Sequence, residues 1–348
     1  MKYSTLGMTD IKVSLICLGT MTFGEQNSEA EAFAQMDAAT AAGINFFDTA
    51  ELYAVPPRAE TYGATEEIIG NWFQKTGKRK DIVLATKVVG AAGHLPWIRG
   101  GQARLSRAHI DEALAGSLKR LKTDYIDLYQ IHWPQRPVNT FGKLGYDQYS
   151  VSGREAEVIL ETLETLSDAV KAGKIRHIGV SNETPWGVMK YLELASRHNL
   201  PRIQSIQNPY SFLNRSFEVG LAEMAMQEKT GLLAYAPLAA GTLTGKYLDG
   251  QMPAGSRRAI DSRASRYDRK GVDDIVRGYI DIAARFGLDV TVMSHAFVNT
   301  RPFLTANIIG ATRVEHIQTA LAALDVTLPP ELLAEVEALH ARHPIPCP

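Results

Sequence analysis

The chain has 348 residues, a formal net charge of −1 and two cysteines. Such a balance of charge offers no broad attraction to nucleic acid or to an anionic membrane, and two cysteines cannot build a disulfide framework. No uncharged run approaches the ~20 residues of a membrane-spanning helix, and the first residues lack the apolar core of a signal peptide. The composition therefore predicts a cytoplasmic globular protein without nucleic-acid or membrane partners, and leaves open whether it is a monomer or a homo-oligomer.

Short apolar runs alternate with amphipathic stretches along almost the whole chain, which is typical of strands alternating with helices. After a hairpin-like segment at residues 2–13, the expected strands are 14–18, 44–47, 82–86, 126–131, 175–182, 203–208, 232–237 and 305–310. The expected helices are 29–42, 65–75, 109–122, 155–172, 185–198, 216–229, 273–286, 290–299, 314–324 and 331–341.

Eight strand–helix units follow the hairpin, and strands separated by helices favour parallel pairing. Eight such units can close into a (β/α)8 barrel, for which about 250 residues suffice. The surplus residues fall after strand ends, at 88–108, 134–153 and 239–272, where such a barrel has its catalytic face. The alternative is an open doubly wound sheet, but no Gly-x-Gly-x-x-Gly follows the first strand. We predict an α/β fold: one (β/α)8 TIM barrel domain over 1–348, with an N-terminal β-hairpin and extra C-terminal helices.

Four polar side chains stand at or just after the ends of three successive strands. Asp48 ends one strand, and Tyr53 lies on the loop that follows it. Lys87 and His132 directly follow the next two strands. Because the carboxyl ends of parallel barrel strands open onto one face, we expect these four groups to share a pocket.

The four groups suit acid–base chemistry. An ammonium beside a phenol lowers the phenol's pKa from its usual value near 10, so Lys87 is expected to tune Tyr53 while Asp48 pairs with Lys87. His132 can hydrogen-bond a substrate oxygen and orient it. Together they can protonate a carbonyl oxygen as a nucleophile reaches its carbon. None of them is a hydride donor, so a reduction requires a cofactor.

Each of these residues also has a structural interpretation. Asp48 and Lys87 can form a plain ion pair at the barrel mouth, Tyr53 can be a loop aromatic, and His132 can be a core histidine. Their joint position at strand ends favours catalysis. No metal is expected, because His132 and Asp48 lack partners at the spacing of zinc ligands.

At these residues the chain resembles the aldo-keto reductase family over nearly its full length. The matching motifs are residues 18–24, 43–53, 85–87, 117–121 with 124–132, 173–176 with 178–182, and 243–246. Residues 132–137 and 141–146 resemble the bacterial Tas-like, NADP(H)-dependent branch of that family. The resemblance implies a (β/α)8 barrel that binds NADPH or NADP in an extended pose without a Rossmann fold.

The resemblance also implies roles for individual residues. Tyr53 is expected to be the general acid/base, with Asp48 and Lys87 as partners and His132 orienting the carbonyl. Expected cofactor contacts are Gly19, Thr20, Met21, Asp48, Ser181, Asn182, Gln207, Tyr235, Ala236, Pro237, Leu238, Ala239, Gly241, Leu243, Lys246, Gly310, Thr312, Arg313 and His316. The expected substrate pocket is formed by Phe23, Tyr53, His132 and Trp133.

Within the cofactor set, Ser181, Asn182 and Gln207 are expected to hold the nicotinamide carboxamide, and Tyr235 to stack on its ring. Asn182, Gln207 and Tyr235 also have structural interpretations, as partners of backbone groups or as rim packing. The segment from Ala236 to Lys246 matches the family's pyrophosphate-covering loop.

The adenosine end of the cofactor is less securely matched. Arg313, at the start of a helix, is the candidate contact for the 2′-phosphate, with Arg257 and Arg258 as second choices. The family usually has glutamine or arginine at the position of His316 and asparagine at that of Ala320. These departures leave the preference for NADPH over NADH open. Residues 54–62 form a further insertion, interpreted either as a wall of the substrate entrance or as a surface feature.

The expected activity is NADPH-dependent reduction of an aldehyde or ketone to an alcohol, with alcohol oxidation as its reverse. Two alternatives stay open. One is a regulatory subunit that senses the NADPH/NADP ratio and turns over slowly, and the other is a lyase or isomerase that uses Lys87 as a Schiff-base amine. The sequence does not identify the natural substrate.

Overall fold

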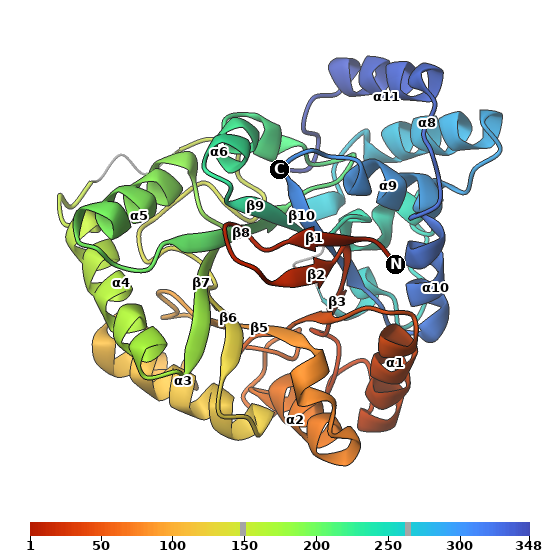
Figure 1. Cartoon of the computed structure of the whole chain (residues 1–348). Coiled ribbons are helices and arrows are strands. Elements are labelled where there is room, and N and C mark those ends of the chain that lie inside the picture. Colours follow the sequence, from red (N-terminus) through yellow and green to blue (C-terminus); the bar gives the residue numbers. More distant parts are fainter. Residues whose placement is uncertain (147–150, 262–265) are drawn as a thin grey trace.

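The computed structural model describes residues 1–146, 151–261 and 266–348, and its central feature is a closed barrel of eight parallel strands. Neighbouring strands in the barrel follow one another in the chain, and the last pairs with the first (Figure 1). The predicted (β/α)8 barrel is therefore confirmed. Its strands are β3 Ile16–Gly19, β4 Phe46–Asp48, β5 Val83–Val88, β6 Ile126–Ile131, β7 Ile175–Ser181, β8 Ile203–Pro209, β9 Gly231–Tyr235 and β10 Leu304–Gly310.

Helices surround the barrel on its outside (Figure 1). They are α1 Glu29–Ala41, α2 Ala64–Thr76, α3 Arg107–Leu121, α4 Glu155–Lys171, α5 Pro185–Arg197, α6 Leu221–Gln227, α7 Arg257–Ile260, α8 Val272–Arg285, α9 Val290–Asn299, α10 Val314–Ala322 and α11 Pro330–Arg342. Short 3-10 helices occupy η1 Lys78–Asp81, η2 Arg99–Gly101, η3 Ser216–Glu218, η4 Ala239–Thr244 and η5 Leu248–Gly250. In the described ranges, no helix combines the length and apolar character that crossing a membrane requires.

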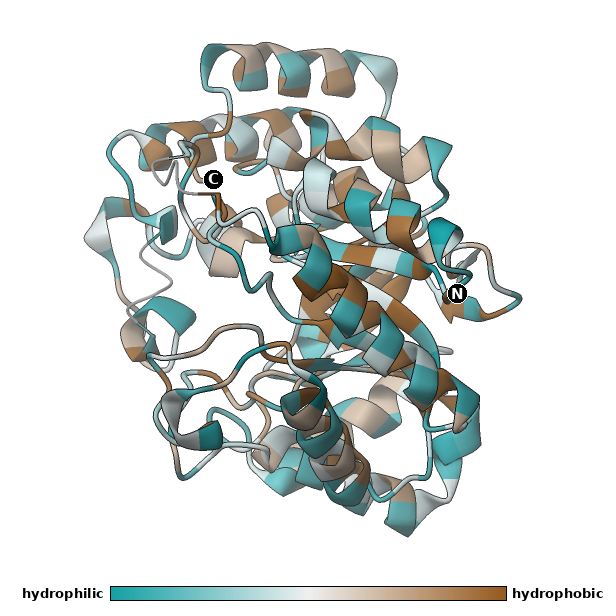
Figure 2. Ribbon diagram, turned by 90° about the vertical axis from the view of Figure 1, so that its left-hand side faces the viewer, coloured by the Kyte–Doolittle hydropathy of each residue, from teal (hydrophilic) through white to brown (hydrophobic). Residues whose placement is uncertain are grey.

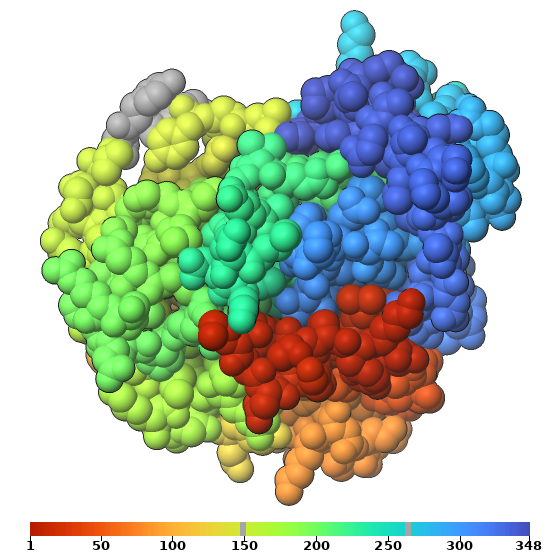
Figure 3. Space-filling view, turned by 45° about the horizontal axis from the view of Figure 1, so that its top comes forward, coloured from red at the N-terminus to blue at the C-terminus, as the bar shows by residue number. Residues whose placement is uncertain are grey.

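The predicted hairpin closes the N-terminal end of the barrel. Strands β1 Tyr3–Thr5 and β2 Lys12–Ser14 pair antiparallel, and Figure 3 shows the N-terminal residues, in red, lying across this end. Leu6 and Val13 are fully buried against the apolar lower layers of the barrel interior.

The strands are buried on both faces, so inward and outward side chains must each find a suitable environment. Along β4 and β5, Phe46 and Ala85 face the interior cluster, whereas Phe47 and Leu84 pack toward the helices. The period of two then places Asp48 and Lys87 inside the barrel. Figure 2 shows apolar residues concentrated where the helices meet the barrel, with hydrophilic residues outside.

One predicted helix is wrong as a continuous element. Residues 216–229 were expected to form one helix, but η3 ends at Glu218 and α6 begins at Leu221. Between them Gly220 adopts φ 103°, a left-handed conformation that glycine tolerates and that interrupts a right-handed helix.

The three long segments at 88–108, 134–153 and 239–272 all follow the carboxyl ends of barrel strands, as predicted. Parts of the last two, residues 147–150 and 262–265, lie outside the described residues. Two of these segments touch each other, because Arg269 Nη2 donates to the Gly142 carbonyl at 2.6 Å. Residues 54–62 contact the last of these segments, because Arg257 donates to the Val55 carbonyl. The Val55 amide donates to the Met21 carbonyl.

Candidate active site

The structure brings the four predicted catalytic side chains together at the C-terminal end of the barrel. Lys87 Nζ lies 2.7 Å from Asp48 Oδ2 and 3.4 Å from the Tyr53 hydroxyl. It also donates to the Thr49 carbonyl at 2.8 Å. The ring of His132 meets that of Tyr53 edge-on, with centroids 5.7 Å apart. An acid, an ammonium, a phenol and an imidazole therefore form one continuous group.

Asp48 is held from both sides. Its Oδ2 accepts from Lys87, while its Oδ1 accepts from Gln207 Nε2 at 2.8 Å and from Gln130 Nε2 at 3.1 Å. Charge-assisted hydrogen bonds of this kind orient a carboxylate strongly. The sequence interpretation did not include Gln130, although its position two residues before His132 places it on the same inward face.

Burial and neighbouring charges oppose each other at Lys87 and Tyr53. Burial lowers the pKa of Lys87, but Asp48 and Tyr53 outweigh it, so the net pKa is raised and the amine stays protonated. Burial raises the pKa of Tyr53, and the nearby Lys87 lowers it only in part. The expected direction of the lysine's effect is present, but desolvation of the phenolate is the larger effect, so the net pKa of Tyr53 is raised. At neutral pH the pair consists of an ammonium and a protonated phenol.

His132 is a buried, neutral imidazole. Burial, followed by the charge of Lys87, lowers its pKa well below the usual value. Asn182 Nδ2 donates to the His132 carbonyl at 2.9 Å, which fixes the backbone at this point. The imidazole Nδ1 is buried without a hydrogen-bond partner among the described residues. A buried ring with an unpaired nitrogen suits a neutral hydrogen-bonding role toward a ligand.

His132 should make stability depend on pH in acid. Because its pKa is lower in the folded than in the unfolded chain, unfolding takes up a proton below about pH 6.5, so the free energy of unfolding falls as pH falls. We expect His132→Gln to lose less stability than the wild type between pH 7 and pH 5. Urea denaturation at both pH values measures how much the free energy of unfolding changes with pH. An equal change in the two proteins would contradict a lowered pKa of His132 in the folded chain.

The residues expected at the nicotinamide also converge. Tyr235 donates to Asn182 Oδ1 at 2.6 Å, and Ser181 Oγ donates to the Gln207 carbonyl at 2.8 Å. Asn182 adopts φ 53°, a left-handed conformation that asparagine tolerates better than most residues. The guanidinium of Arg266, which the sequence interpretation missed, lies 5.8 Å from the Tyr235 ring centroid.

The expected pyrophosphate loop and phosphate helix form a second polar region. Ala236, Ala239 and Ala240 all adopt left-handed backbone, and such residues persist where the surroundings determine the loop's shape. The segment runs on through Leu243 to Lys246. Pro237 lies in a turn that closes with the Ala239 amide donating to the Ala236 carbonyl at 2.8 Å. Leu238 and Gly241 are the ends of the next turn, which closes with the Gly241 amide donating to the Leu238 carbonyl at 2.9 Å.

Basic groups gather beside the first turn of α10. Burial, then the charges of Arg313 and Lys246, lowers the pKa of His316, so both charges lie near its ring. The Thr312 amide donates to His316 Nδ1 at 3.2 Å, and Gly310 ends the preceding strand. Neither Lys246 nor Arg313 has a carboxylate partner in the described part of the chain. Unpaired cations beside a helix N-terminus fit a phosphate group.

The first barrel strand contributes backbone and packing. The Thr20 hydroxyl donates to the Asp48 carbonyl at 2.8 Å, and a Cβ at Gly19 would lie 2.8 Å from the Ile309 carbonyl. Phe23 is fully buried in the core between barrel and helices, so its side chain offers no open wall in this structure. Trp133 is partly exposed, and its ring is tilted against that of His132 with centroids 4.7 Å apart. Its indole nitrogen donates to the Ala91 carbonyl.

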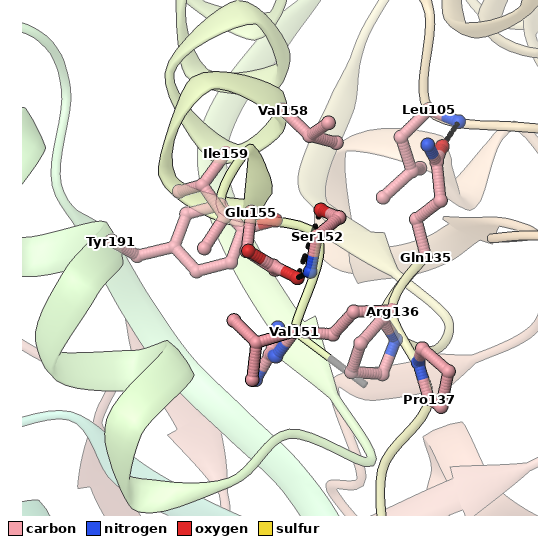
Figure 4. Close-up of a pocket in the computed structure, with 11 residues that line it drawn as sticks. Leu105, Gln135, Arg136, Pro137, Val151, Ser152, Glu155, Val158, Ile159 and Tyr191 are labelled. Atoms are coloured by element: carbon pink, nitrogen blue, oxygen red, sulfur yellow. Dashed lines mark hydrogen bonds between the residues drawn. The ribbon is translucent and has the colours of Figure 1, made fainter. Parts of the chain in front are cut away.

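A cavity of about 320 Å³ lies outside this group of residues, between the loop after β6 and helices α4 and α5 (Figure 4). Gln135 accepts from the Leu105 amide at 2.6 Å along one side, and Glu155 accepts from the Ser152 amide on another. None of the four predicted catalytic residues lines the cavity. Among the described residues, no cluster of three or more His, Cys, Asp or Glu side chains is arranged to hold a metal ion.

Two buried ion pairs lie next to the site, and the sequence interpretation did not include either of them. Glu51 pairs with Arg99, and Glu66 pairs with Arg120. Glu66 also accepts from the Thr86 hydroxyl, next to Lys87 in the chain. Their partners are distant in sequence and share no motif spacing, so a one-dimensional pattern gave no signal for the pairing.

A closed parallel barrel with a polar constellation at its C-terminal end defines a class of barrel enzymes. Comparison with known proteins narrows this class, because the sequence model of the aldo/keto reductase family matches residues 15–341. The chain belongs to the aldo/keto reductase family and is an oxidoreductase.

Individual relatives agree with this assignment. The chain is 52% identical to Protein tas of Escherichia coli K12 over 349 residues, covering all of both chains. It is 35% identical to the uncharacterized oxidoreductase YrpG of Bacillus subtilis, over 96% of this chain and 94% of that protein. It is also 32% identical to a probable voltage-gated potassium channel subunit beta of Oryza sativa subsp. japonica, over 97% and 96% of the two chains.

Proposed function

We propose that this protein is an NADPH-dependent carbonyl reductase that converts an aldehyde or ketone to an alcohol. The observation that carries the proposal is the contact of Lys87 Nζ with both Asp48 and the Tyr53 hydroxyl at the mouth of the barrel. This geometry supports the proposal because the Tyr53 phenol, with the Lys87 ammonium next to it, would be a proton donor for a carbonyl oxygen at the barrel mouth.

Tyr53 acts as the general acid. Its raised pKa keeps the phenol protonated at neutral pH, so a proton is available for the developing alkoxide. As the proton leaves, the phenolate gains a charge that the Lys87 ammonium stabilises at short range. Asp48 holds that ammonium in place through a 2.7 Å contact. In the reverse direction, the same phenolate accepts the proton of an alcohol.

His132 orients the carbonyl. Its neutral ring packs edge-on against Tyr53, so a hydrogen bond from the imidazole and one from the phenol can converge on one oxygen. Trp133 adds an apolar surface beside the ring. Orientation of this kind increases the reaction rate, because the reacting groups are already held in a reactive geometry when the substrate binds.

The described residues fit a nicotinamide dinucleotide. Asn182, Gln207 and Tyr235 would hold its nicotinamide end, while Lys246 and Arg313 would hold phosphate groups. When bound, NADPH supplies the hydride that this chain's side chains lack. The test is a panel of aldehydes and ketones assayed with NADPH and NADH in parallel. The absence of cofactor-dependent turnover across a broad panel would oppose the proposal.

The proposed 2′-phosphate contact predicts a cofactor-specific effect. Arg313→Ala should weaken NADPH binding by about tenfold or more, because a charge-assisted contact to phosphate contributes about 1.5–3 kcal/mol. NADH binding should change by less than about twofold, since NADH lacks that phosphate. Fluorescence titration of both cofactors measures the difference. Arg107→Ala, at an exposed ion pair elsewhere, is the control, and equal losses for both cofactors would contradict the assignment.

The Schiff-base alternative is disfavoured by the state of Lys87. A nucleophilic lysine needs a lowered pKa, whereas Asp48 and Tyr53 raise the pKa of Lys87 above its usual value despite burial. Its three neighbours, the Asp48 carboxylate, the Thr49 carbonyl and the Tyr53 hydroxyl, also engage all three ammonium donors.

A regulatory role is the second candidate, because one relative is named as a probable potassium channel subunit beta. Steady-state turnover measured alongside a pull-down of partner proteins distinguishes the two. Slow turnover with a stoichiometric partner would favour regulation, and rapid multiple turnover without one would favour the reductase.

A further inference from the structure

Glu51 lies in the short segment between Asp48 and Tyr53, and its carboxylate is completely buried. Oε1 accepts from the Val89 amide at 2.8 Å and from Arg99 Nη2 at 2.7 Å. Oε2 accepts from Arg99 Nη1 at 3.0 Å and from the Tyr62 hydroxyl at 2.8 Å. A buried charge with four hydrogen bonds is costly to arrange and strongly directional.

These contacts extend the pairing between β4 and β5 beyond the end of β4. The Thr49 amide donates to the Ala85 carbonyl at 2.9 Å, and the Glu51 amide donates to the Lys87 carbonyl at 3.2 Å. At the next step the side chain of Glu51 takes over, accepting from the Val89 amide. The backbone carrying Tyr53 is thereby tied to the backbone on both sides of Lys87.

Arg99 compensates the charge of the buried Glu51 carboxylate. Its side chain is 3% exposed and comes from the long segment after β5, far from Glu51 in sequence. Without a cation, the Glu51 carboxylate would face a large desolvation penalty. Tyr62, at the end of the inserted residues 54–62, adds a hydrogen bond to the same carboxylate. The segment after β5 and residues 54–62 thus both contact the side chain of Glu51, next to the active site.

We propose that Glu51 and Arg99 form a positioning pair that fixes the separation of Tyr53 and Lys87 and thereby sets the rate of proton transfer. The proposal rests on the reductase function argued above. Neither residue is placed against the substrate. Their effect passes through the short segment that connects Glu51 to Tyr53.

Asp127, on β6, provides a matched control, because its carboxylate also accepts from a backbone amide of β5. It is buried, it accepts from the Leu84 amide of β5 at 3.0 Å, and it pairs with Arg79 at 2.8 Å. Glu51 makes the equivalent contacts at the opposite end of β5. A purely structural role predicts that Glu51→Gln and Asp127→Asn behave alike. A positioning role predicts that only Glu51→Gln changes catalysis.

The experiment compares these two variants as full-length proteins. Both are expected to unfold at lower temperature than the wild type. Glu51→Gln should lower kcat at least about tenfold while NADPH affinity stays within about twofold, whereas Asp127→Asn should keep kcat within about twofold. The half-maximal pH for alcohol oxidation should rise in Glu51→Gln, because a phenol farther from Lys87 gains less help in ionising. Wild-type kcat and pH profile in a folded Glu51→Gln would overturn the proposal.

Milder variants keep the test decisive if Glu51→Gln fails to fold. Tyr62→Phe removes one hydrogen bond from the carboxylate and should lower kcat by about two- to fivefold. Arg99→Lys retains the charge without the two-pronged geometry and should keep more activity than Arg99→Met. The double variant Glu51→Gln, Arg99→Met should be no slower than the slower single variant, because the two side chains act as one unit. Wild-type kcat in Tyr62→Phe together with equal rates for Arg99→Lys and Arg99→Met would overturn the proposal.

Hydrogen exchange separates failure of this proposal from failure of the reductase assignment. Amides of residues 49–55 should exchange faster in Glu51→Gln than in the wild type or Asp127→Asn, whether or not the wild type turns over any substrate. Unchanged exchange in that segment would overturn the positioning role by itself. If the wild type showed no carbonyl reductase activity but exchange was still faster in Glu51→Gln, the role of Glu51 and Arg99 in holding Tyr53 would stand. Only the proposed reaction would then be rejected.

Discussion

Tyr53→Phe is expected to lower kcat by about 10²- to 10⁴-fold, which is the usual contribution of a positioned general acid. The phenyl ring preserves the packing against His132, and Lys87 keeps its contacts with Asp48 and the Thr49 carbonyl. The substitution removes the transferable proton together with the 3.4 Å contact between the hydroxyl and Lys87 Nζ. Stopped-flow measurement of NADPH oxidation with an active carbonyl substrate gives the rate, and fluorescence titration should show an NADPH dissociation constant within about twofold of wild type.

Tyr3→Phe is the matched control for that substitution. Tyr3 lies on the hairpin at the opposite end of the barrel, where its hydroxyl donates to the Gly43 carbonyl at 2.8 Å. Each substitution removes one hydroxyl oxygen and one hydrogen bond, but Tyr3 lies far from the site, so the kcat of Tyr3→Phe should remain close to wild type. If Tyr53→Phe retained comparable activity to Tyr3→Phe, Tyr53 would not be the acid.

Lys87→Met should affect both activity and stability. The side chain of Lys87 has no exposed surface, and it neutralises Asp48, whose side chain is 4% exposed. Removal of one partner of a buried ion pair strands the other charge and typically costs about 3–5 kcal/mol. The free energy of unfolding, measured in urea, should fall by about that amount, and turnover should fall at least as far as in Tyr53→Phe because the phenolate loses its counter-charge.

The double variant Asp48→Asn, Lys87→Met distinguishes the two effects. An amide carries no stranded charge and can still hydrogen-bond Gln130 and Gln207, so the double variant should be more stable than Lys87→Met alone. It should remain inactive, since no cation faces the phenol. A double variant less stable than Lys87→Met would contradict the view that the buried charge of Asp48 is what destabilises the single variant.

Much of the fold followed from patterns that are local in the chain. Apolar runs of strand length separated by amphipathic helical stretches predicted each barrel strand, and the same patterns placed Asp48, Lys87 and His132 at strand ends. The expected helix at 216–229 failed for an equally local reason, since a single glycine, Gly220, with positive φ divides it. Periodicity across a glycine does not show whether the helix continues.

The site was predictable only in part, because the sequence indicates which residues end each strand but not which residues of different strands contact each other. His132 was predicted to belong to the site and Gln130 was not, although the two lie two positions apart and therefore face the same side of β6. The net direction of the pKa change at Tyr53 could not be predicted for a different reason. The charge of Lys87 was visible in the sequence, whereas the burial that outweighs it exists only after folding.

The sequence by itself determined the eight-unit barrel, the end of it that carries the chemistry, and the four side chains gathered there. These follow from covalent order and from the periods of two and 3.6 residues, which act between near neighbours. Only the tertiary structure decided that Gln130 and Gln207 orient Asp48, that Arg99 neutralises Glu51, and that burial outweighs Lys87 at the phenol. Those results depend on distance and desolvation among residues far apart in the chain, and neither quantity is defined before the barrel closes.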